Sequence, residues 1–179
     1  MITVSFLTVL ALVGSGLAGP LQAAAPTGDF KSTMLKGHNW YRGEHNASPV
    51  TWNADAAKNA QAWVNKCNYE HQSGNKYGEN LAAGGLSSWD QVINMWGGER
   101  TKYDYNKPGF SSQTGHFTQM VWKNTKSIGC AWKQCPGSVG TFVACEYSPA
   151  GNIIGDNNQH FKDNVQKQTK GKASDKFSS

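Results

Sequence analysis

The sequence predicts an α+β protein in which helices come first along the chain and strands follow. Apolar residues recur at helical spacing up to about residue 100. Beyond residue 115, the segments are short and rich in aromatic and β-branched residues. Helices and strands that are segregated in this way pack as helical layers on an antiparallel sheet, whereas alternating elements form a parallel doubly wound sheet.

The chain begins with an apolar segment that has the outline of a secretory signal peptide. Residues 1–30 contain no Lys or Arg, and the run from Val4 to Val13 is almost wholly apolar but too short to span a bilayer. Small residues predict cleavage after Ala18, with a cut near Ala23 as the alternative. We therefore expect a signal peptide over 1–18, a disordered leader remnant over 19–28, one folded domain over 29–161, and a flexible basic tail over 162–179.

The formal net charge of +5 is concentrated at the C-terminus. Residues 162–179 contain five lysines and only two aspartates. A solvated, frayed terminus explains this excess without a nucleic-acid partner. We expect no nucleic-acid binding and, because no second long apolar run follows the leader, no transmembrane segment.

Three helices are predicted in the first half of the folded domain. Asp29 is placed to cap a helix that ends near Asn46, and a second helix is expected over about 55–66. Ser88 and Gln91 form a capping-box pattern that opens a third helix. The side chains expected to face the core from these helices are Met34, Gly37, Tyr41, Ala56, Ala60, Trp63, Val64, Trp89, Val92, Ile93 and Trp96.

The second half of the domain is predicted to supply the sheet. Glycines around residues 74–85 indicate at most a short helical turn near Glu79. The segment Pro49–Trp52 is predicted to be a short extended link. Tyr103–Gly115 is typical of a loop. The three antiparallel strands are expected over Phe117–Trp122, Ser127–Trp132 and Thr141–Tyr147.

Four cysteines remain after the leader, and an even number in an oxidising compartment indicates disulfides. Three pairings are open. A zinc site at Cys130 and Cys135 is disfavoured, because no second Cys or His pair has matching spacing.

Two histidines and two glutamates could carry chemistry: His71, Glu79, Glu99 and His116. Imidazole and carboxylate groups brought together by folding can hold a divalent ion. The spacing of these residues matches no local metal motif, so a buried cluster of ion pairs that only orders the fold is the alternative interpretation.

Several segments together resemble the cysteine-rich secretory, antigen 5 and pathogenesis-related (CAP) superfamily. The most specific block runs from Gly115-His116-Phe117-Thr118-Gln119 to Gly129-Cys130-Ala131. His38–Arg42, Trp52-Asn53 and Tyr77–Leu81 precede it in the order of the family. The resemblance covers roughly residues 30–155 and is greatest to the fungal and yeast sterol-exporting branch.

The resemblance implies a fold and a site. The fold is an α-β-α sandwich with a three-stranded antiparallel sheet between helical layers. His71, Glu79, Glu99 and His116 would converge in a central cleft that can bind zinc or magnesium, neither being required for lipid uptake, and Gln119 would line it. The implied disulfides pair Cys67 with Cys135 and Cys130 with Cys145.

The resemblance also implies a secreted, monomeric protein that binds and exports sterols and fatty acids. Its sterol-binding loop would be Tyr103–Gly115, with apolar contacts from Tyr103, Tyr105, Pro108 and Phe110. The alternative is an extracellular signalling protein with a host or cell-surface target, although Glu146 replaces an asparagine of the plant peptide segment. A metal-dependent hydrolase is a third candidate, disfavoured because the chain has no nucleophile elbow and no H-E-x-x-H motif.

Overall fold

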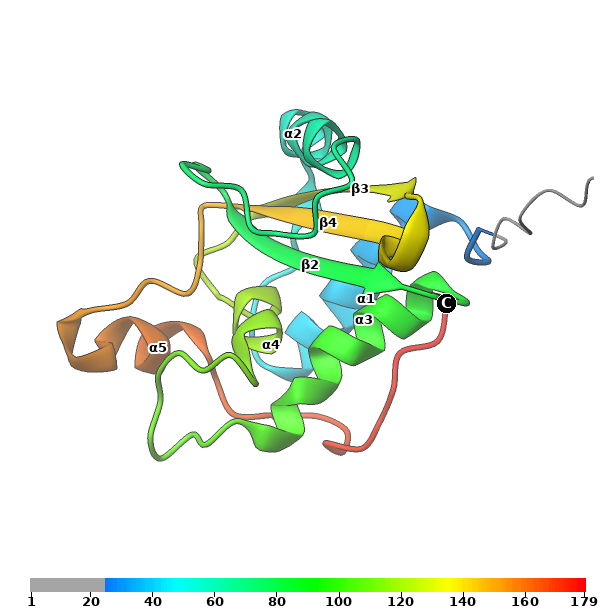
Figure 1. The fold of residues 1–179 in the computed structure, drawn as a ribbon. Helices are drawn as coiled ribbons and strands as arrows, with labels where there is room; N and C mark the ends of the chain where they lie inside the picture. The colour runs from blue at the N-terminus through cyan, green and yellow to red at the C-terminus, as the bar shows by residue number, and fades with distance from the viewer. Residues whose placement is uncertain (1–24) are drawn as a thin grey trace, which may run out of the picture.

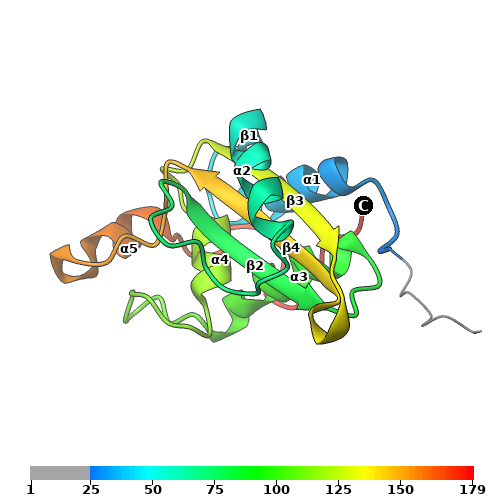
Figure 2. The ribbon, with the colours of Figure 1, turned by 45° about the horizontal axis from the view of Figure 1, so that its top comes forward.

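The computed structural model describes residues 25–179, and the predicted signal peptide lies outside them. The chain forms three layers around a central sheet (Figures 1 and 2). Helix α2 (Ala54–Val64) covers one face of the sheet, whereas α1 (Phe30–Glu44), α3 (Trp89–Gly98) and α4 (Gly115–Met120) lie on the other. The α-β-α layering expected from the resemblance is therefore present.

The three predicted helices are present, each with its N-terminal cap. The Asp29 carboxylate accepts a hydrogen bond from Ser32 N at 2.6 Å. The Ser88 hydroxyl accepts one from Gln91 N at 3.2 Å, as the capping pattern predicts. These side chains satisfy amide groups that have no partner in the first turn of a helix.

The sheet has four strands in the order β1-β3-β4-β2. Strand β1 (Thr51–Trp52) pairs parallel with β3 (Ser127–Gln134), while β4 (Thr141–Ser148) pairs antiparallel with both β3 and β2 (Gly78–Gly84). The prediction of three antiparallel strands was wrong in number and direction. The extended link before α2 became an edge strand because its backbone pairs with β3.

Phe117–Trp122, predicted as a strand, begins in helix α4. Its aromatic and β-branched content favours a strand, but its tertiary contacts favour a helix. Phe117 and Met120 are both fully buried at helical spacing. The first amides of α4 also find an acceptor, because Phe117 N donates to Glu99 Oε2 at 3.0 Å.

Gly78–Gly84, expected to contain at most a helical turn, is the edge strand β2. Its glycines are typical of turns when read locally. The segment nevertheless pairs along its whole length with β4, from Gly78 opposite Tyr147 to Gly84 opposite Thr141. Pairing with a distant strand therefore overrides local propensity here.

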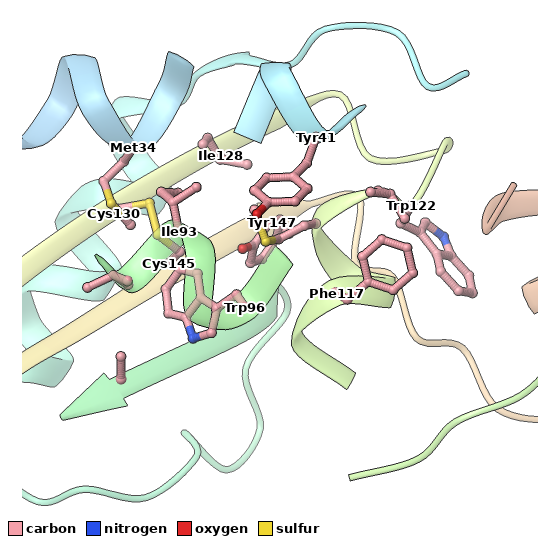
Figure 3. Packing of buried hydrophobic residues seen from close by; sticks show 14 of the residues in the cluster. Met34, Tyr41, Ile93, Trp96, Phe117, Trp122, Ile128, Cys130, Cys145 and Tyr147 are labelled. Atoms are coloured by element: carbon pink, nitrogen blue, oxygen red, sulfur yellow. A yellow bond between two sulfur atoms is a disulfide. The ribbon is translucent and has the colours of Figure 1, made fainter. Parts of the chain in front are cut away.

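The core consists of two apolar clusters, one on each face of the sheet. The larger lies between the sheet and α1, α3 and α4 and includes Met34, Tyr41, Ile93, Trp96 and Phe117 (Figure 3). The smaller lies under α2. Both faces of β4 are covered, and residues Thr141–Tyr147 are all buried.

Both disulfides that the resemblance implies are formed. Cys130 and Cys145 lie opposite each other on β3 and β4, so this bond crosses the centre of the sheet (Figure 3). Cys67, just after α2, pairs with Cys135 at the end of β3 across 68 residues. No cysteine in the described residues is free.

The residues at both ends of the described chain correct the expectation of disordered termini. Helix α5 (Gln159–Asn164) is followed by a segment that lies along α1 and α3 and ends near α3 (Figure 1). Arg100 donates hydrogen bonds to the carbonyl groups of Ala173, Lys172 and Asp175, and Phe177 is buried. Thr27 N donates to Ser87 O. Polar composition predicted a solvated tail, but hydrogen bonds from the Arg100 side chain and burial of Phe177 hold it against the domain.

Short 3₁₀ turns span Glu99–Lys102, Gly137–Val139 and Asp156–Asn158. Within residues 25–179, every helix is too short or too polar to cross a bilayer.

Candidate functional site

A cleft of about 330 Å³ opens at the edge of the sheet, beside the first residues of β2. Successive side chains of a strand point to opposite faces of the sheet, and at this edge both Glu79 and Asn80 line the cleft. His71, Glu79 and Phe110 line it together with His116 and Gln119. The fold therefore brings five predicted site residues from distant segments to one opening, and Glu99 contacts His116 from behind it.

The first polar pair in the cleft joins His71 to Glu79. The loop before β2 carries His71, whose Nδ1 lies 2.7 Å from Glu79 Oε1. The same carboxylate oxygen accepts a hydrogen bond from Gln72 N at 3.1 Å. The hydrogen bond to Glu79 raises the pKa of His71 above its ordinary value, although partial burial opposes this.

The second pair joins His116 to Glu99. His116 Nδ1 lies 2.7 Å from Glu99 Oε1, and the imidazole stacks on the Trp96 ring at a centroid distance of 6.0 Å. Asn80 donates to His116 O at 3.0 Å and thus fixes α4 against β2. The other oxygen of Glu99 caps the start of α4, so this carboxylate positions both the helix and the histidine.

Both pairs leave the Nε2 atom of the imidazole available. A carboxylate oxygen only accepts, so each Nδ1 carries the hydrogen and each Nε2 of the neutral ring keeps its lone pair. No hydrogen bond from residues 25–179 reaches Nε2 of His71 or His116. Metal-binding histidines commonly donate their second ring N–H to a carboxylate in this way.

Imidazole nitrogen is a common ligand of zinc, and both imidazoles line the same cleft. The four predicted ligands are not equivalent, because each glutamate binds a histidine. Among the described residues, no three His, Cys, Asp or Glu side chains are close enough together to hold one ion. Each carboxylate is thus the hydrogen-bond partner of one histidine in this arrangement.

Gln119 lies in the cleft wall, on helix α4 and not on the predicted strand. Its Oε1 accepts a hydrogen bond from Gly151 N at 3.0 Å. A Cβ atom at Gly78 would lie 2.1 Å from the same oxygen, so only glycine leaves room for this side chain. Gln119 therefore joins α4, β2 and the segment after β4.

Sequence reasoning missed Glu146 as a member of this region. Glu146 on β4 is opposite Glu79 in register and fully buried. Its carboxyl group accepts hydrogen bonds from Asn59 and Asn75. Burial, reinforced by the nearby Glu79 carboxylate, raises the pKa of Glu146 to about 7. Its position in a strand buried on both faces was the available signal.

The four predicted contacts of the Tyr103–Gly115 loop have different environments. Tyr103 is buried and packs edge-on against Phe117 and Tyr105, so it anchors the loop to the core. Pro108 and Tyr105 are partly exposed. Phe110 alone is exposed at 51%, and it lines the cleft with the two histidines.

The fold, the two disulfides and the two His–Glu pairs together are features of one class of proteins. Residues 35–147 match the Cysteine-rich secretory protein family, CAP. The chain is therefore a member of the CAP family.

Fungal and plant proteins are among its relatives. The chain is 42% identical to Protein PRY2 of Saccharomyces cerevisiae over 142 residues, which are 76% of this chain but 41% of the yeast protein. It is 34% identical to Pathogenesis-related protein 1 of Arabidopsis thaliana, covering 82% of this chain and 90% of the plant protein. The chain thus spans less than half the length of the yeast relative and nearly all of the plant one.

Among solved structures, the fold is similar to that of NaASP2 with Zn²⁺. The TM-score is 0.64 at 22% identity, with 80% of this chain and 88% of NaASP2 covered. This likeness concerns the fold alone.

Proposed function

We propose that this CAP-domain protein is secreted and binds and exports sterols and fatty acids. Its apolar leader, the two disulfides and the Candida albicans relative named Secreted protein RBT4 support an extracellular location. The observation that carries lipid binding is Phe110, a half-exposed aromatic side chain at the mouth of a cleft. An apolar ligand that covers this ring removes it from water, which favours binding.

The His71 and His116 imidazoles are proposed to hold zinc through their Nε2 atoms, since magnesium prefers oxygen ligands and both carboxylates already bind a histidine. Glu79 and Glu99 would fix the ring orientation through Nδ1. When bound, the ion supplies positive charge that orients water or a polar ligand oxygen. NaASP2, whose fold is similar, was solved with Zn²⁺. The ion is not required for lipid uptake, because the exposed ring of Phe110 is not a ligand.

Changing Phe110 to serine is expected to lower sterol affinity about tenfold or more, since the contact loses the free energy of burying an aromatic ring. The measurement is saturation binding of a labelled sterol to the secreted protein, together with mass spectrometry of lipids that co-purify. Met95→Ser is the matched control, because Met95 is 49% exposed in a different hollow on α3. Absence of saturable sterol binding by the unmodified protein would refute the proposed function and favour the signalling alternative.

A further inference from the structure

Exposed apolar side chains gather at one end of the molecule. Five large hydrophobic residues are exposed among residues 25–179, and three of them lie on two neighbouring loops. Phe110 belongs to the loop before α4, and Ile153 and Ile154 follow β4. Figures 1 and 2 both show these two segments projecting at the same end of the molecule. Ile154 is the most exposed of the five, at 71%.

The backbone after β4 is built to hold the two isoleucines outward. Five of the seven residues from 152 to 158 have positive φ angles: Asn152, Gly155, Asp156, Asn157 and Asn158. Asparagine and aspartate adopt this conformation more readily than other non-glycine residues, and all four non-glycine residues here are Asn or Asp. Here the Asn152 side chain donates to Gly115 O at 2.8 Å and accepts from the Thr118 hydroxyl at 2.6 Å. The exposure of Ile153 and Ile154 is therefore a fixed feature of the loop.

The two loops enclose a hollow with a basic rim. This space of about 460 Å³ is lined by Phe110 and Ile154, and also by Lys102, Lys107 and Asp104. Both lysines are exposed: Lys107 belongs to the same loop as Phe110, and Lys102 ends the 3₁₀ turn just before that loop. The hollow beside Phe110 and Ile154 is thus lined by two ammonium groups and one carboxylate.

We propose that Phe110, Ile153 and Ile154 form a tip that inserts into the interface of an anionic lipid bilayer. Lys102 and Lys107 would contact the negatively charged headgroups, which attract basic side chains near the surface. The inference rests on the proposed function, since the tip borders the mouth of the cleft. Insertion of the tip would bring that mouth to the membrane surface, where a lipid leaves the bilayer.

A protein partner fits these observations less well. A stable protein interface buries about 800 Å² on each partner, and three side chains on two narrow loops supply a small part of that. Protein interfaces are enriched in aromatic residues, Met and Arg, whereas this tip presents two isoleucines and flanking lysines. Reversible insertion into a bilayer needs only a small apolar area together with charge attraction.

The test is sedimentation with vesicles of phosphatidylcholine and phosphatidylserine that contain no sterol. The unmodified protein is expected to bind, and the double variant Ile153→Ser/Ile154→Ser to bind at least about tenfold more weakly, because two apolar side chains no longer enter the interface. Met95→Ser should bind like the unmodified protein. Both isoleucines are exposed, so the variant should keep its melting temperature.

Binding of dissolved sterol separates this inference from the proposed function. The double variant should keep its sterol affinity in solution while losing vesicle binding. Vesicle binding without any sterol binding would support the tip and refute the proposed function. Equal sedimentation of the double variant and the unmodified protein, or no sedimentation of either, would overturn the tip. Self-association that the double variant abolishes, without vesicle binding, would also overturn it in favour of a protein interface.

Discussion

Replacing Arg42 with leucine should lower the free energy of unfolding by about 4 kcal/mol or more, because four carbonyl groups lose a donor, three of them in buried hydrogen bonds. Arg42 is fully buried on α1. Its guanidinium donates to Ser48 O, Met120 O, Trp122 O and Thr125 O at 2.8 to 2.9 Å. Met120 O lies at the C-terminal end of α4, where helix carbonyl groups lack partners, and Trp122 O follows two residues later.

The loss should reach the candidate site as well as stability. Arg42 fixes the C-terminal end of the helix that carries His116, so a loosened α4 would also weaken the cleft. Denaturant unfolding at neutral pH measures the first effect. Arg42→Lys should have an intermediate stability, because an ammonium group reaches fewer of the four acceptors. A loss below about 1 kcal/mol in the leucine variant would contradict this role.

The folded protein should lose stability as the pH falls from 7 to 4, because two buried histidines resist protonation. Burial lowers the pKa of His38 to about 4 and that of His45 to about 4. In the unfolded chain both have the ordinary value of 6.5, so the unfolded state binds protons first. The stabilisation is complete above pH 6.5 and declines toward pH 4, by about 3 kcal/mol for each histidine.

Glu146 should oppose this decline. Its raised pKa of about 7 keeps the buried carboxyl group protonated, so it favours the folded state increasingly as the pH falls from 7 to its ordinary value of 4.5. That contribution is also about 3 kcal/mol, which leaves a net loss of about 3 kcal/mol. The raised pKa of His71 also favours the folded state in acid. Its side chain is 70% exposed, however, so this contribution to stability is small.

Denaturant unfolding at pH 7 and pH 4 measures the two opposing effects. Glu146→Gln should roughly double the loss of stability in acid, because the opposing group is removed. His45→Gln should reduce it, while its amide can still donate to Gln166 O in place of Nδ1. A Glu146→Gln variant with the same pH dependence as the unmodified protein would exclude the assigned protonation of Glu146.

The helical layers were predictable from the sequence because their signals are local. Asp29 and Ser88 cap helices where the pattern predicts, and Trp89, Ile93 and Trp96 face the core as the spacing indicates. In these segments, amphipathic spacing and capping favour the same structure.

The sheet could be predicted only in part, since its membership depends on contacts between distant segments. Gly78–Gly84 contains residues typical of turns yet pairs along β4. Phe117 and Val121 belong to a segment with strand-like composition, but buried contacts to α1 and Glu99 favour a helix. Propensity is weak where burial on all sides decides the conformation.

Residue type singled out the two histidines and two glutamates, but only the resemblance implied that they share one cleft, because their spacing matches no motif. Local patterns also did not predict that Glu79 and Glu99 would each bind one histidine. Ile153 and Ile154 were missed for a related reason. Their exposure follows from how the segment after β4 lies against α4, through the contacts of Asn152 with Gly115 and Thr118, which are distant in the sequence.

Zinc titration of the single histidine variants most directly tests whether the two His–Glu pairs face one cleft. The unmodified protein should bind one ion per chain, and His71→Ala or His116→Ala should each abolish that binding. Met95→Ser should leave it unchanged. Full zinc binding by either histidine variant, or independent binding of two ions by the unmodified protein, would contradict a shared site.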